Sequence, residues 1–342
     1  MTSLPWRYWV VLTVILLTGC NQPDQPASKT KLASQGLLTA ALSPNGDYLF
    51  TGSFQHGGAL WDQTHQARLF DWNHGDGDYA AYYAADFSED GKFLAATDGA
   101  TVTLWNAETG QSALYLQSPA QSLNIQNTNA IWQTTTPEAN NYWQRPARIT
   151  DIAFSRQYIL LALENQLALL VDSTRQEIIG ALSHGDLVTD VAMDERANLA
   201  VTGTRHGELR LWSLDSGETL SQRNYQSSIS FVAMSGDGRQ VVVAAAQGPV
   251  ELLTFDATPE PEVTRLFTGN PGIIAATFDQ GDLILGSSRE RVWRIEGSSG
   301  KIQNQWQIPA RGPWHKAAIL ALHSHAGSIQ AIASDGYAYQ LN

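Results

Sequence analysis

Cysteine is almost absent from this chain of 342 residues, which has one, Cys20. An internal disulfide bond is therefore excluded. Basic side chains are also scarce, because 21 lysines and arginines stand against 33 aspartates and glutamates, for a net charge of −12. Phosphate binding needs a clustered basic surface, so the composition predicts no nucleic-acid partner.

Recognisable catalytic motifs are missing as well. The chain has no GxSxG, HExxH, phosphate-loop or CxxC motif, which argues against an enzyme and leaves no reason to expect a cofactor or a metal. His323 and His325 alternate on a strand-to-turn stretch, but no third metal ligand accompanies them.

Long apolar runs occur only near the N-terminus. The run YWVVLTVILLTG, residues 8–19, follows Arg7. It is shorter than the roughly 20 residues of a membrane-spanning helix and is typical of a signal-peptide core. It leads into LTGC at 17–20, which resembles the bacterial lipobox. The resemblance implies a signal peptide over residues 1–19 and a lipoprotein whose mature chain begins at an acylated, palmitate-bearing Cys20, with several acyl chains holding it to the membrane.

Two other interpretations stay open, an ordinary signal peptide that happens to end in cysteine and an uncleaved anchor. Lipidation has support from the cysteine count, because no thiol would remain free in an oxidising periplasm. Residues 20–29 are polar and proline-rich, as expected of a lipidated tether. Asn21 is not the aspartate that retains lipoproteins at the inner membrane of enteric-type bacteria, so the rule implies the outer membrane, with the protein facing the periplasm.

The rest of the chain is a repeat. Seven units end at similar apolar-then-polar pairs, and the spacings between them are 44, 66, 41, 43, 40 and 46 residues. These pairs are Trp61-Asp62, Trp105-Asn106, Val171-Asp172, Trp212-Ser213, Phe255-Asp256, Ile295-Glu296 and Leu341-Asn342. A repeat of about 40–45 residues made of several short strands is typical of propeller blades.

The best units are LSPNGDYLFTGS…LWD, FSEDGKFLAAT…TLWN and SHGDLVTDVAM…LAVTGT…LRLWS. They resemble WD-repeat β-propellers. Residues Gln55, Gly99 and His206 stand where that family has an aspartate, so its hydrogen-bonded tetrad is incomplete here. We expect an all-β fold, a seven-bladed propeller of four-stranded antiparallel blades over residues 30–342. The chain stops at the third strand of unit seven, so we expect the segment TKLAS at 30–34 to complete the last blade.

One interval is about 23 residues too long and marks an insertion at 118–148. Its loop should emerge on the same face as residues 71–83 and 309–316. We predict a partner-binding surface there, because large rings and arginines dominate protein interfaces. Arg145 and Arg311 could join the predicted partner-binding residues, which are Tyr79, Tyr82, Tyr83, Trp132, Tyr142, Trp143, Arg205, Arg289 and Trp314. The alternative is that individual rings fold back over the blades.

Other polar residues have structural explanations. His74 and His184 are expected to brace loops between blades. Asp151 and Asp190 lie on innermost strands near the channel, where a carboxylate pair could bind a cation, although polar channel linings are common. The sequence thus predicts a lipid-anchored, non-enzymatic interaction scaffold of the cell envelope that binds an unidentified envelope protein. The alternative is a periplasmic enzyme or a small-ligand or metal binder that uses the central channel.

Overall fold

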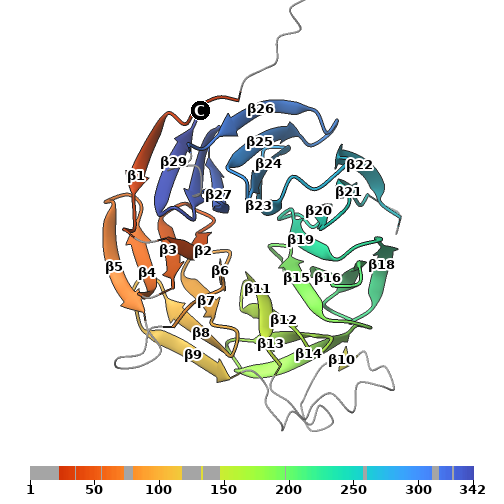
Figure 1. The fold of residues 1–342 in the computed structure, drawn as a ribbon. Helices are drawn as coiled ribbons and strands as arrows, with labels where there is room; N and C mark the ends of the chain where they lie inside the picture. Colours follow the sequence, from red (N-terminus) through yellow and green to blue (C-terminus); the bar gives the residue numbers. More distant parts are fainter. Residues whose placement is uncertain are drawn as a thin grey trace, which may run out of the picture.

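The computed structural model describes residues 23–34, 36–54, 56–72, 80–117, 132–133, 147–196, 198–256, 260–309, 316–325 and 327–342. These residues form seven sheets arranged around a central axis (Figure 1), which confirms the predicted seven-bladed propeller. The arrangement is compatible with a WD-repeat-like propeller. Over the described ranges, no helix is both long and apolar enough to cross a bilayer.

Each blade runs from an inner strand at the axis to an outer strand at the rim. Blade one contains β2 (Leu37–Leu42), β3 (Tyr48–Ser53), β4 (Gly57–Asp62) and β5 (Ala67–Trp72). Blade two contains β6 (Ala84–Phe87), β7 (Phe93–Thr97), β8 (Thr101–Asn106) and β9 (Ser112–Gln117). Blade three contains β11 (Ile149–Ser155), β12 (Tyr158–Leu163), β13 (Leu167–Asp172) and β14 (Glu177–Ser183).

The second half of the ring repeats this order. Blade four contains β15 (Val188–Met193), β16 (Leu199–Thr204), β17 (Glu208–Ser213) and β18 (Thr219–Asn224). Blade five contains β19 (Ile229–Met234), β20 (Gln240–Ala245), β21 (Val250–Thr254) and β22 (Glu262–Phe267). Blade six contains β23 (Ile273–Asp279), β24 (Asp282–Ser287), β25 (Arg291–Glu296) and β26 (Ile302–Gln307). Blade seven contains β27 (Ile319–His325), β28 (Ser328–Ala333), β29 (Tyr337–Leu341) and β1 (Ser28–Lys31).

A serine closes the turn between the first two strands in blades one, two and five. In blade one the Ser43 hydroxyl donates to Asn45 Oδ1 at 2.7 Å and accepts the backbone N–H of Tyr48 at 2.9 Å. Gly46 has a φ of 76°, in the left-handed region that glycine adopts without strain. The same hydrogen bonds form around Ser88 and Ser235. The repeated Ser-x-Asn/Asp-Gly pattern is therefore a turn signal, because it satisfies backbone groups locally.

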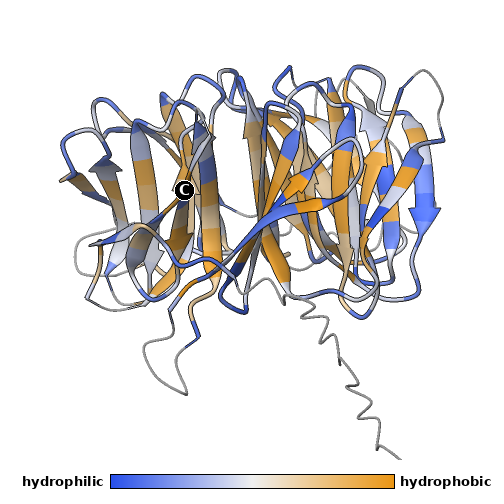
Figure 2. Ribbon diagram, turned by 90° about the horizontal axis from the view of Figure 1, so that it is seen from above, coloured by the Kyte–Doolittle hydropathy of each residue, from blue (hydrophilic) through white to orange (hydrophobic). Residues whose placement is uncertain are grey.

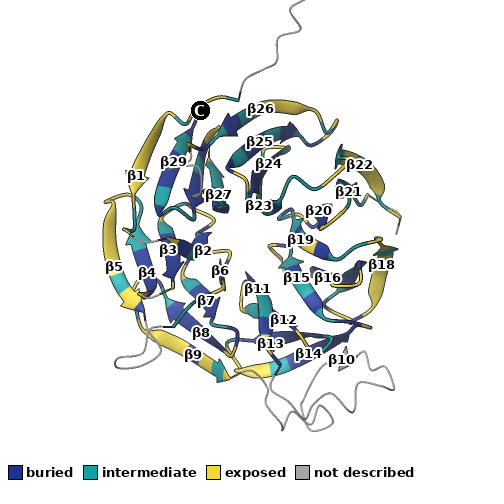
Figure 3. Cartoon of the chain, viewed as in Figure 1, coloured by how far each residue is buried: buried dark blue, intermediate teal, exposed yellow. Residues whose placement is uncertain are grey.

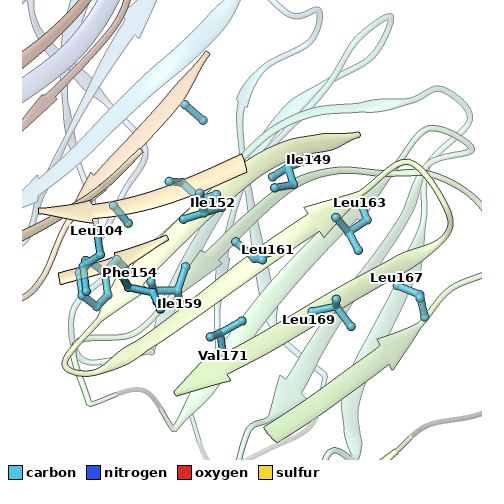
Figure 4. Close-up of a cluster of buried hydrophobic side chains, with 14 of the residues drawn as sticks. Leu104, Ile149, Ile152, Phe154, Ile159, Leu161, Leu163, Leu167, Leu169 and Val171 are labelled. Carbon is cyan, nitrogen blue, oxygen red and sulfur yellow. The ribbon is translucent and has the colours of Figure 1, made fainter. Parts of the chain in front are cut away.

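The core lies between neighbouring blades. Apolar residues fill the middles of the strands and polar residues concentrate at the turns (Figure 2). The second strands of the blades, such as β3, β12, β16, β20 and β24, are largely buried, the innermost strands mix buried and half-buried residues, and outer strands such as β5, β9, β18 and β22 are mostly exposed (Figure 3). Between blades two and three, Leu104 packs with Phe154 and Val171 in one buried cluster (Figure 4). Between blades one and two, the rings of Trp72 and Trp105 stack at 4.9 Å.

The N-terminal strand closes the ring, as predicted. β1 pairs antiparallel with β29, from Ser28 opposite Gln340 to Lys31 opposite Tyr337. The strand thus begins two residues before the predicted segment. Residues preceding β1 are bonded too: the Asp24 N–H donates to the Gln305 carbonyl at 2.7 Å, and the Gln307 N–H donates to the Asp24 carbonyl at 2.9 Å. This part of the expected tether therefore runs along the wall of the propeller.

Blade three has one strand more than the others. β10 (Trp132–Gln133) pairs parallel with β14, with Trp132 opposite Gly180. β10 belongs to the insertion at 118–148, most of which lies outside the described residues. The pairing places this part of the insertion at the rim of blade three, where it covers the edge of an unusually apolar outer strand.

Removal of residues 24–31 should weaken the closed ring. A chain that begins at Leu32 loses the β1–β29 ladder and leaves the β29 edge unpaired, so we expect a melting temperature lower by about 5 °C and some self-association. Thermal unfolding and size-exclusion chromatography measure both effects. A chain that begins at Pro23 is the control, and equal melting temperatures for the two chains would contradict closure by β1.

Candidate functional site

The exposed aromatic side chains of Phe54 and Tyr83 lie on one side of the ring, which also carries three exposed arginines. We call it the loop face: it carries the turns between the second and third strands and the connections from one blade to the next. Its described candidates are Phe54, Tyr83, Arg148, Arg205 and Arg289. Phe54, in the turn after β3, is 65 % exposed, the largest value among the exposed large hydrophobic residues. A ring with so little burial contributes little to the fold, so it is available to a partner.

Tyr82 and Tyr83 immediately precede β6 and have opposite environments. Tyr83 is exposed, and the Arg148 guanidinium lies 5.1 Å from its ring centroid. Tyr82 is fully buried and meets the rings of Phe50 and Trp105 edge-on, each at 5.7 Å. Burial also raises the pKa of Tyr82 above its usual range. Tyr82 is thus a core residue whose side chain a partner cannot reach, whereas Tyr83 is on the surface as expected.

The arginines of the loop face differ in their surroundings. Arg205 donates from Nη2 to Asp186 Oδ1 at 2.9 Å, yet its side chain stays 59 % exposed. His206 contacts the same carboxylate, with 3.2 Å between Nδ1 and Oδ2. Arg289 follows β24 and is exposed as well. Asp186 therefore holds the side chains of Arg205 and His206 in place. These side chains would lose less conformational entropy when a partner binds.

Several predicted residues cannot be placed. Cys20, Tyr79, Tyr142, Trp143 and Trp314 lie outside the described residues, as do His74, Arg145 and Arg311. For Trp132 only the strand position in β10 is described. The roles expected of these residues stay predictions. Of the predicted residues, Tyr83 contacts Arg148, a residue that the sequence analysis missed.

A cavity of about 340 Å³ lies on the propeller axis, lined by all seven inner strands. Its two sides differ in chemistry. Leu38, Ile274 and Leu320 form an apolar wall, and Asp151 and Asp190 lie on the other side. Tyr83 also lines the cavity, which therefore adjoins the loop face.

The two carboxyl groups hold neighbouring blades together. One Asp151 oxygen accepts the N–H of Val191 at 3.0 Å, and one Asp190 oxygen accepts the N–H of Val232 at 2.5 Å. Burial raises the pKa of both groups, and the nearby charge of Asp151 together with a hydrogen bond between the two carboxyls raises that of Asp190 further. Such a hydrogen bond needs one proton on the pair, so Asp190 stays protonated to higher pH than an exposed aspartate.

A third carboxyl also links two neighbouring blades, and the sequence analysis missed it. Asp86 of β6 accepts the N–H of Phe154, in blade three, at 2.8 Å, and burial raises the pKa of Asp86 to about 7. Together with Asp151 and Asp190 it links blades two to five in series. The cation that the sequence allowed at Asp151 and Asp190 is not required by this geometry, because backbone N–H groups already satisfy both carboxyls.

The histidines have structural surroundings. His184 is buried, its ring meets Trp212 edge-on at 5.3 Å, and its Nδ1 lies 3.5 Å from Glu208 Oε2. Trp212 Nε1 in turn donates to Thr202 Oγ1 at 2.8 Å. His184 thus braces blade four, as expected. Burial lowers its pKa. His323 and His325 stack at 6.5 Å, and no group of three potential metal ligands occurs among the described residues.

Substitution of Asp190 by asparagine should change how stability depends on pH. A carboxyl with a raised pKa stabilises the fold below its unfolded pKa of about 4, and this contribution is lost as pH rises through the folded pKa. Asparagine keeps an acceptor for Val232 and a donor for Asp151 but cannot ionise. Between about pH 5 and pH 9 we expect wild type to lose on the order of 1 kcal/mol relative to Asp190→Asn.

Denaturant unfolding at both pH values measures this difference. Asp256→Asn, at an exposed site, is the control and should follow wild type. Identical pH dependence for wild type and Asp190→Asn would show that Asp190 is ionised in the folded state.

Comparison with known proteins adds no relative: no family model and no curated protein matches this chain. The fold, the loop face and the cavity are therefore the grounds on which function is argued.

Proposed function

We propose that the protein is a lipid-anchored, non-enzymatic scaffold of the bacterial cell envelope that binds a partner protein on its loop face. The propeller fold is commonly a protein-interaction scaffold. The observation that carries the proposal is the exposure of Phe54 and Tyr83 on the loop face, with the Arg148 guanidinium against the Tyr83 ring. Rings and arginines on a rigid support match the composition of interface hot spots.

The anchor rests on the sequence motif. LTGC at 17–20 resembles the lipobox, and Cys20 is the only cysteine. Asn21 favours the outer membrane, with the propeller in the periplasm. The described chain begins immediately downstream, at Pro23, and Asp24 is already bonded to β26. A lipid at Cys20 would therefore hold the whole ring beside the bilayer.

A second function has one observation in its favour. The central cavity is large enough for a small molecule and has an apolar and a polar wall. In that case the protein would bind a small ligand on its axis. Phe54 distinguishes the two functions, because it belongs to the loop face and does not line the cavity.

Truncation of the exposed rings should release the partner without unfolding the propeller. We expect Phe54→Ala with Tyr83→Ala to lower the yield of specific cross-links in intact cells about tenfold, because each ring at a hot spot contributes 1 kcal/mol or more. Mass spectrometry of cross-linked membranes measures the yield. Tyr115→Ala, which removes a ring 52 % exposed on β9 of the outer wall, is the matched control. Unchanged cross-links in the single Phe54→Ala variant would contradict binding at this part of the loop face.

Replacement of the cysteine should release the protein from membranes. Cys20→Ser removes the sulfur that the lipid needs, so we expect the variant to move from the membrane fraction to the soluble fraction or to keep its signal peptide. Mass spectrometry of the N-terminal peptide measures the acyl groups directly. A wild-type N-terminus without acyl groups would refute the anchor.

A further inference from the structure

The N-terminal segment is fixed to the outer walls of blades six and seven. Backbone hydrogen bonds join Asp24 to Gln305 and Gln307 of β26, and the Ala27 N–H donates to the Gln340 carbonyl of β29 at 2.8 Å. From Asp24 onward the chain therefore follows the surface of the ring. It cannot act as a spacer between the ring and a membrane.

The remaining linker is short. Between Cys20 and Asp24 lie Asn21, Gln22 and Pro23. Four residue steps reach at most about 14 Å even when fully extended. A six-residue strand such as β26 is itself roughly 20 Å long. A lipid on Cys20 thus keeps the end of β26 at Gln305 and Gln307 close to the bilayer surface.

The charge of this wall suits an anionic surface. β1 carries Lys29 and Lys31, both exposed, and no carboxylate. Lys29 Nζ lies 5.0 Å from the centroid of the Tyr337 ring, so the side chain lies against the wall. Lys301, immediately before β26, is exposed as well. Each lysine near an anionic bilayer contributes about 1 kcal/mol.

Among the described outer strands, only β1 has two basic side chains and no carboxylate. β5 balances Arg68 with Asp71, β14 has only Glu177 as a charged residue, and β18 has a single arginine, Arg223. β26 has no charged residue of its own, its Ile302 is 40 % exposed, and the exposed Asp24 that lies against it adds one carboxylate to the three lysines. The chain as a whole carries a net charge of −12, so an anionic bilayer repels most of the surface and favours this wall.

We propose that the outer wall formed by β26 and β1 is a membrane-binding surface for an anionic lipid bilayer, so that the propeller stands on its edge with the loop face turned sideways. The proposal rests on the lipid anchor of the proposed function. It adds which part of the ring meets the lipid, and it leaves the loop face free for a partner.

The cysteine content makes the test direct. With Cys20 acylated, no other thiol is present, and a single introduced cysteine can be labelled with an environment-sensitive fluorophore. Ile302→Cys places the label on β26 of blade six, and Leu220→Cys places it on β18, two blades away around the ring (Figure 1). The two native side chains are matched, with 40 % and 41 % exposure. Both variants are made in the purified, lipidated full chain.

Vesicles of phosphatidylethanolamine and phosphatidylglycerol with nitroxide-labelled headgroups serve as the probe. We expect strong quenching at position 302 and several-fold weaker quenching at position 220. Lys29→Gln with Lys31→Gln should lower the quenching at 302, whereas Lys92→Gln, an exposed lysine of blade two, should leave it unchanged. Asn304→Cys provides a second position on β26 if Ile302→Cys folds poorly.

Two failures remain distinguishable. If the chain does not float with vesicles in a density gradient, the lipid anchor of the proposed function is wrong and the inference falls with it. If the chain floats but both labels are quenched equally, or position 220 more strongly, the anchor stands and the orientation is wrong.

Discussion

The pairing of β1 with β29 joins the two ends of the chain in one sheet, and the rest of the structure depends on it. Six blades are continuous stretches of chain, but blade seven takes its outer strand from the N-terminus. The core is built between blades, so blade seven must also pack against its neighbours on both sides. Ile332 lies in a buried cluster with Leu37 of blade one, and Ile329 lies in another with Trp306 of blade six. Closure therefore sets the curvature that creates both the axial cavity and a continuous loop face.

The parts of the fold that could be predicted are those with local causes. Ser43, Ser88 and Ser235 close equivalent turns through hydrogen bonds that span five residues or fewer. Because these bonds are local, the same Ser-x-Asn/Asp-Gly pattern recurs in the sequence. Blade four, which lacks this turn, was recognised from its other repeat motifs, and the remaining blades were found from the spacing of their strand ends. The closing strand was predictable from an incomplete last repeat. Its onset at Ser28 was not, because it is set by pairing with distant Gln340.

The candidate site was less predictable because its contacts cross blades. Tyr82 and Tyr83 are neighbours just before β6, and packing against Phe50 and Trp105 in blades one and two decides that the Tyr82 ring is the buried one. Arg148 comes 65 positions after Tyr83 in sequence, and nothing near it signals that contact. Asp86 sits in an alanine-rich strand without the Thr-Asp pair that drew attention to Asp151 and Asp190. A buried carboxylate needs a hydrogen-bond partner. Each aspartate on an inner strand could therefore have been predicted to accept a hydrogen bond from a backbone N–H of the next blade.

The bonds of Asp24 to β26 also have a mechanical consequence. The N-terminal segment that would connect the ring to the lipid also contains β1, which closes the ring. A pull on Cys20 would first load the two hydrogen bonds of Asp24 on blade six and then the β1–β29 ladder of blade seven. Force would thus be shared between blades six and seven before any strand could separate. The same contacts that close the ring would therefore also protect it against unfolding by a pull on the anchor.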